Sequence, residues 1–159
     1  MNIVAILAVI IIGLSAGLRT FTAPAVVAWS AYLGWINLDH TPFVFMASPI
    51  SIAIFSFLAF GEYVWDVLPS TPSRTQAPGL IGRILTGAFS AACLLAATNN
   101  NLLLCILGSF AAICAAFAGY QMRVRLVRAL GVKDAFIAIP EDLVAVGLAI
   151  LSVLLVSDR

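Results

Sequence analysis

The residues of this chain that could do acid–base or ion-binding chemistry are a few charged side chains within strongly apolar sequence. Glu62 and Asp66 lie four residues apart, so on a helix they share one face. An ionisable group at mid-bilayer costs roughly 2.5–3.5 kcal/mol on insertion scales, so such groups pair with one another, face water or perform a function. The candidate substrate- or ion-binding residues are Arg19, Glu62, Asp66, Arg83, Glu141 and Asp142.

Glu62 is the candidate titrating group, because it lies about one helical turn deeper in apolar sequence than Asp66. Two interpretations follow from its position. In the first, Glu62 binds and releases a proton in a proton- or cation-coupled site. In the second, it forms a structural ion pair with Arg19 or Arg83 that holds the helices together. The residue types leave both interpretations open.

Glu141 and Asp142 directly follow Pro140, and proline favours the first position of a helix. Carboxylates in a first turn complement the positive end of the helix by about 0.3–1 kcal/mol. The alternative is that both residues join Glu62 and Asp66 in a cation site, because hard cations prefer clustered oxygen ligands.

Arg19 and Arg83 each lie close to a proline that is expected to open a helix, Pro24 and Pro78. Backbone N–H groups at a helix N-terminus can hold an anion together with an arginine, so a substrate with a phosphate or carboxylate fits both arginines. The alternative is that each arginine reaches to the membrane interface or pairs with a carboxylate.

Residues that usually build metal and nucleophilic sites are scarce. The chain has one histidine, His40, and three cysteines, none of which form a Cys-x-x-Cys pair. The zinc-protease pattern His-Glu-x-x-His is also absent. We therefore expect no metal and no cofactor, and an enzyme acting on lipid headgroups is the least favoured class of function.

Six apolar segments must position the charged residues, and they cover about 3–16, 24–36, 48–67, 78–97, 102–121 and 140–156. The fifth is open to continuation as a basic extension to Leu130. Spanning the hydrocarbon takes roughly 20 helical residues, so the first, second and sixth segments are short. They either cross a locally thinned bilayer or enter it from one side.

Composition places the whole chain in a membrane. Of its 159 residues, 63% are hydrophobic and only 9% are charged, whereas a soluble domain carries about 25% charged residues. These values exclude a soluble monomer, and a net charge of +1 excludes a nucleic-acid-binding protein. We expect an all-α integral membrane protein with a single domain, 1–159, whose six short transmembrane or half-spanning helices form three helical hairpins, about 3–36, 48–97 and 102–156.

Basic residues predict the orientation of these hairpins. Seven of them fall on one side of the membrane, and only Arg159 falls on the other; the seven are Arg19, Arg74, Arg83, Arg123, Arg125, Arg128 and Lys133. Because basic residues in short connections favour the cytoplasm, this pattern predicts the inner (plasma) membrane with both termini outside. Arg123, Arg125 and Arg128 are also the expected contacts for an anionic lipid, although the orientation rule accounts for them equally well.

The fourth and fifth segments are rich in glycine, alanine and serine. Small residues spaced four apart let membrane helices approach closely. They either pack against each other within one chain or form a homo-oligomer, and the sequence leaves both arrangements open.

Four short runs give the chain a family resemblance: 17–21, 61–69, 82–83 and 139–142. With these runs the chain resembles a bacterial family of small integral membrane proteins that is catalogued only as a domain of unknown function. The resemblance covers most of the chain. It implies a multi-helix membrane domain and brings no established activity with it.

These observations predict a small multi-pass membrane protein that is a transporter or channel for a small solute or ion, with a charged site near the cytoplasmic face. The alternative is a structural, assembly or lipid-binding membrane subunit without transport activity. The expected partners are the lipid bilayer, an anionic lipid and a second copy of the chain, and not nucleic acid.

Overall fold

The computed structural model describes residues 3–66, 76–131 and 134–157, and for 65–66 and 134–135 it describes the backbone alone. The described ranges are all-helical and contain no strand. Their α-helices are α1 (Ile3–Leu18), α2 (Thr22–Tyr32), α3 (Pro49–Asp66), α4 (Ala77–Ala97), α5 (Cys105–Leu130) and α6 (Asp134–Val156), and the 3-10 helices are η1 (Val44–Ala47) and η2 (Leu102–Leu104).

The described part of the chain contains three helices that are long and apolar enough to cross a membrane. They are α4, the continuous run Leu102–Leu130 and the segment Phe136–Val156 of α6. Two further apolar helices, Ile3–Leu18 and Pro49–Val64, are shorter. The six predicted segments therefore correspond to the six α-helices, and half of these have membrane-spanning length.

Two helix ends differ from the predicted boundaries by four residues or more, and in one case the cause is local backbone geometry. The prediction that the second segment reaches residue 36 was wrong, because α2 ends at Tyr32. Gly34 adopts a left-handed conformation (φ 72°), and the N–H of Trp35 returns to the carbonyl of Ser30 at 2.8 Å. This is the glycine-based cap that closes many helices.

The predicted start of the last helix at Pro140 was also wrong, because α6 begins at Asp134 and contains Pro140 in its interior. Proline inside a helix cannot donate to the carbonyl four residues earlier, yet the helix continues. Glu141 and Asp142 consequently lie well inside α6. The prediction that their negative charges complement the positive end of the helix was therefore wrong.

The basic extension of the fifth segment is helical, as the sequence allowed. α5 continues to Leu130 and ends where Gly131 adopts φ 62°, with its N–H bonded to the carbonyl of Val127 at 3.0 Å. This extension places Arg123, Arg125 and Arg128 on the last two turns of a continuous helix.

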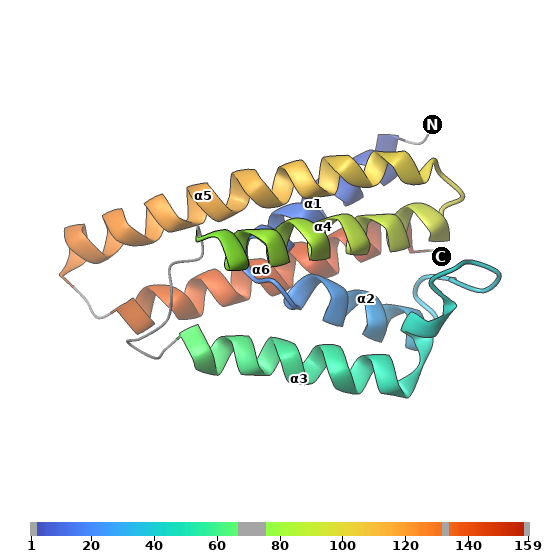
Figure 1. The fold of residues 1–159 in the computed structure, drawn as a ribbon, viewed down its shortest axis with the longest axis horizontal. Coiled ribbons are helices and arrows are strands. Elements are labelled where there is room, and N and C mark those ends of the chain that lie inside the picture. The colour runs from blue at the N-terminus through green and yellow to red at the C-terminus, as the bar shows by residue number, and fades with distance from the viewer. Residues whose placement is uncertain (1–2, 67–75, 132–133, 158–159) are drawn as a thin grey trace.

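Successive helices run in opposite directions, and both termini lie at the same end of the bundle (Figure 1). α1 packs against α4, α5 and α6, whereas α3 packs against α2 and η1 at the edge of the bundle. Because of this alternation, Arg19, Glu62, Arg83 and Asp142 all lie toward the end opposite the termini.

Glycines bring the central helices into backbone contact. Gly13 and Gly17 of α1 face the backbone of α5 at Gly108 and Ala112. Across the α4–α5 interface, a Cβ added at Gly108 would lie 2.7 Å from the carbonyl oxygen of Gly87. The small residues that the sequence singled out therefore pack against each other within the chain.

Candidate functional site

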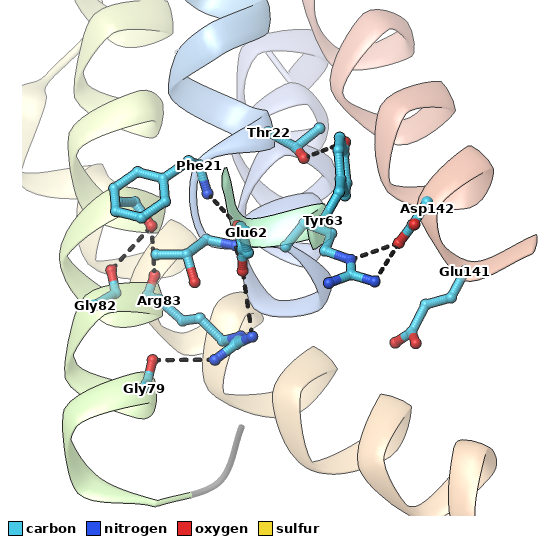
Figure 2. Close-up of polar contacts among 12 residues, drawn as sticks. Phe21, Thr22, Glu62, Tyr63, Gly79, Gly82, Arg83, Glu141 and Asp142 are labelled. Carbon is cyan, nitrogen blue, oxygen red and sulfur yellow. Dashed lines mark hydrogen bonds and ion pairs between the residues drawn. The ribbon is translucent and has the colours of Figure 1, made fainter. Parts of the chain in front are cut away.

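The site begins at the short break between α1 and α2, which consists of Arg19, Thr20 and Phe21. N–H groups at the start of a helix have no partner within that helix. Here the carboxylate of Glu62, on α3, accepts the Thr20 N–H at 2.8 Å and the Phe21 N–H at 2.9 Å (Figure 2). A negative charge is favourable at the N-terminus of a helix. Glu62 supplies this charge to α2, but it does so from α3.

Arg83 of α4 approaches the same carboxylate. Its side chain is almost fully buried, with the residue 4% exposed, and its Nη2 lies 3.5 Å from Oε1 of Glu62. Nη1 donates to the carbonyl of Gly79 at 3.2 Å, within α4. Glu62 therefore connects α3 to α4 as well as to the start of α2.

Arg19 connects the break to α6. The residue is 1% exposed, and both Nε and Nη2 contact Oδ1 of Asp142 at 2.5 Å. Its guanidinium also lies 5.3 Å from the centre of the Tyr63 ring, within the range of a cation–π interaction. The Tyr63 hydroxyl in turn lies 2.8 Å from the hydroxyl of Thr22.

Arg19, Glu62, Arg83 and Asp142 form what we call the charged network. It holds two cations and two carboxylates, and it joins the α1–α2 break to α3, α4 and α6. Two buried arginines and a helix N-terminus are groups that bind carboxylates and phosphates. In this structure, carboxylates of the chain itself fill that role.

The remaining candidate residues have other environments. Glu141 forms an ion pair with Arg123 of α5 at 3.6 Å, while Arg125 and Arg128 are exposed. The side chain of Asp66 lies outside the described residues. Among the residues that the structure describes, no three or more His, Cys, Asp or Glu side chains gather in a way that could hold a metal ion.

The sequence indicated that backbone N–H groups beside Arg19 could hold an anion, but not that the anion is the Glu62 carboxylate. The pairing of the Thr22 and Tyr63 hydroxyls was missed. A signal for these contacts was present, because Arg19 and two threonines stand in a short polar interruption between apolar runs. An interruption of this kind exposes backbone donors, which makes it a natural partner for a carboxylate elsewhere in the bundle.

Residues 13–17 read Gly-Leu-Ser-Ala-Gly, which matches the Gly-x-Ser-x-Gly pattern of serine hydrolases. In those enzymes the pattern forms a strand–turn–helix elbow that exposes the serine. Here it lies inside α1, and Ser15 is fully buried and donates to the carbonyl of Ala145 in α6 at 2.8 Å. Its glycines face α5, so the pattern serves helix packing.

Comparison with known proteins places the chain in a family. No curated protein and no solved structure matches it. The family model described as Domain of unknown function (DUF4126) matches residues 6–155, which include every residue of the charged network. The chain therefore belongs to the DUF4126 family.

Proposed function

We propose that this protein transports a small anionic solute across the inner (plasma) membrane and that Glu62 is its proton-binding residue. The observation that carries the proposal is the hydrogen bonding of the Glu62 carboxylate to the N–H groups ahead of α2, next to buried Arg83. In transporters, interrupted helices whose N-termini point at anionic groups form substrate sites. The α1–α2 break shares one feature with these sites, since the N–H groups ahead of α2 point at the Glu62 carboxylate, although α1 and α2 run in opposite directions (Figure 1).

The proposed membrane placement follows from the direction of the helices. We propose that they form three antiparallel pairs, with the basic connections on the cytoplasmic side and both termini outside. Arg19 and Arg83 lie toward one end of the bundle, and so does the basic end of α5, which agrees with the tendency of basic residues to remain in the cytoplasm. The charged network then lies on the cytoplasmic side of the membrane.

The proposed mechanism is an exchange between the Glu62 carboxylate and a solute anion. A proton from the aqueous side neutralises Glu62, and the N–H groups of Thr20 and Phe21, together with Arg83, then accept the solute anion. Arg19 and Asp142 form an ion pair beside this site, so their charges cancel, and the Tyr63 ring contacts the guanidinium of Arg19. Lower pH therefore favours solute binding, since it favours neutral Glu62.

α3 is the element that this exchange would move. It packs on α2 and η1 at the edge of the bundle, and its outward face is apolar and exposed, including Ile50, Phe57 and Phe60. Glu62 attaches its end to the α1–α2 break, and Tyr63 attaches it to Thr22 at the start of α2. Loss of the Glu62 charge weakens this attachment and lets the end of α3 move away from α2.

We expect small anions to stabilise the purified protein, and to do so more strongly at pH 5 than at pH 8. A ligand present at a hundred times its Kd stabilises a protein by about 2.7 kcal/mol, which a thermal-unfolding assay detects readily. Inorganic phosphate and succinate are suitable probes in detergent, with chloride as the reference anion. In Glu62→Gln, which mimics the protonated carboxylate, only the pH dependence that comes from ionisation of the probe anion itself should remain.

Asp39→Asn is the matched control for this experiment, because Asp39 is an exposed carboxylate in the connector before α3. It should respond to anions and to pH as the unmodified protein does. If neither phosphate nor succinate stabilises the protein at pH 5 or at pH 8, the result contradicts the proposed anion site.

A structural or assembly role is the second candidate, and the ion pairs between helices favour it. Arg19–Asp142 links the end of α1 to α6, and Glu62–Arg83 links α3 to α4. Under this alternative, substitutions in the network lower stability, no anion binds, and the protein purifies with a specific membrane partner.

A further inference from the structure

An apolar cavity lies between the last turns of α5 and the first turns of α6. Its volume is about 320 Å³, and its apolar lining includes Met122, Leu126 and Leu130 of α5 together with Ile137 and Val144 of α6. We call it the α5–α6 groove. Its volume lies within the range of small-ligand sites, which is roughly 300–1,000 Å³.

α5 and α6 extend beyond the other helices at the end opposite the termini (Figure 1). The residues that line the groove lie on these parts of α5 and α6 and at the end of α1, at Leu18. α5 has 26 residues, which at a rise of about 1.5 Å per residue exceeds the roughly 30 Å of a hydrocarbon core. In the membrane placement proposed above, its last turns therefore reach the cytoplasmic headgroups. Met122, Leu130 and Val144 remain largely exposed there, so the groove opens outward at the depth where acyl chains meet headgroups.

The charge beside the groove is positive. α5 contains Arg123, Arg125 and Arg128 and has no acidic residue. Arg123 lines the groove and pairs with Glu141, which lines it from α6. Arg125 and Arg128 are exposed on the same turns, and helical spacing places Arg125 to the side of the lining residues and Arg128 on the opposite face of α5. Basic side chains at a membrane surface attract anionic lipids.

We propose that the α5–α6 groove binds an anionic phospholipid, with part of an acyl chain between the two helices and the phosphate near Arg123 and Arg125. An apolar cavity and adjacent positive charge match the two halves of such a molecule. The site depends on the proposed membrane placement and not on transport, so lipid binding and solute flux are measured independently.

Native mass spectrometry of the full chain in detergent tests this site with phosphatidylglycerol and with phosphatidylcholine of the same acyl chains. The protein should bind phosphatidylglycerol at least tenfold more tightly. Met122→Trp and Val144→Trp fill the groove from opposite helices at exposed positions, and each should weaken that binding at least tenfold. Leu143→Trp adds the same ring to α6 at a neighbouring exposed residue outside the lining, and it should leave binding unchanged.

The headgroup half of the proposal has its own variant. Arg125→Gln should lower the affinity for phosphatidylglycerol toward that for phosphatidylcholine, whereas Arg128→Gln, on the opposite face of α5, should leave it unchanged. Unchanged binding in both folded tryptophan variants would overturn the groove as the site. Two results would overturn the assignment of an anionic phospholipid. The first is equal affinity of the unmodified protein for the two lipids. The second is that glycerol phosphate, which has no acyl chains, competes as strongly as phosphatidylglycerol does.

Discussion

Asp142→Asn is expected to lower the free energy of unfolding by about 3 kcal/mol, because it leaves the guanidinium of Arg19 buried without its charged partner. Arg19 is 1% exposed, whereas the Asp142 side chain is 26% exposed, so the effect should lie at the lower end of the range for buried pairs. Chemical unfolding in detergent micelles measures it.

The double variant Arg19→Met with Asp142→Leu distinguishes a broken pair from general damage to the fold. Replacing both partners of a buried pair with apolar residues is often close to neutral, so the double variant should be more stable than Asp142→Asn alone. Asp39→Asn, an exposed carboxylate outside the network, should change stability by no more than about 0.5 kcal/mol. A double variant less stable than Asp142→Asn would contradict this account of the pair.

Gly108→Ala should destabilise the protein by about 2 kcal/mol, within the range for overpacking a close interface. The new Cβ would lie 2.6 Å from the Cβ of Ala91 and 2.7 Å from the carbonyl oxygen of Gly87. α4 and α5 would have to separate, although alanine is intrinsically the better helix former by about 1 kcal/mol.

Gly147→Ala in α6 is the matched control, because a Cβ there meets open space. It should stabilise the protein by up to about 1 kcal/mol through helix propensity alone. The two substitutions are chemically identical, so opposite signs isolate the steric contact. If both substitutions stabilised the protein by the same amount, the result would contradict the close approach of α4 and α5.

Helix positions were predictable because they depend on local sequence. Apolar runs separated by polar or proline-containing breaks correspond to the six α-helices, and the charged candidates lie toward one end because helices of this length alternate in direction. The start of α6 was not predictable from Pro140, since neighbouring helices can sustain a helix across a proline that local rules treat as a boundary.

The pairing of the charged residues depends on tertiary packing, which composition and spacing do not contain. Arg19 was an expected partner for Glu62, but its ion pair is with Asp142, and Glu62 instead meets Arg83 and the backbone N–H groups of Thr20 and Phe21. Partners separated by 21 to 123 residues are brought together by the packing of α1 against α4 and α6 and of α2 against α3.

Proton-coupled anion flux in reconstituted vesicles tests the central claim, that Glu62 binds the proton that accompanies a solute anion. Vesicles containing the protein and a pH-sensitive dye are given an inward gradient of inorganic phosphate or of succinate. At least one of the two gradients should drive acidification inside vesicles that contain the unmodified protein or Asp39→Asn, and folded Glu62→Gln should abolish it. Acidification by Glu62→Gln at the rate of the unmodified protein would contradict the claim.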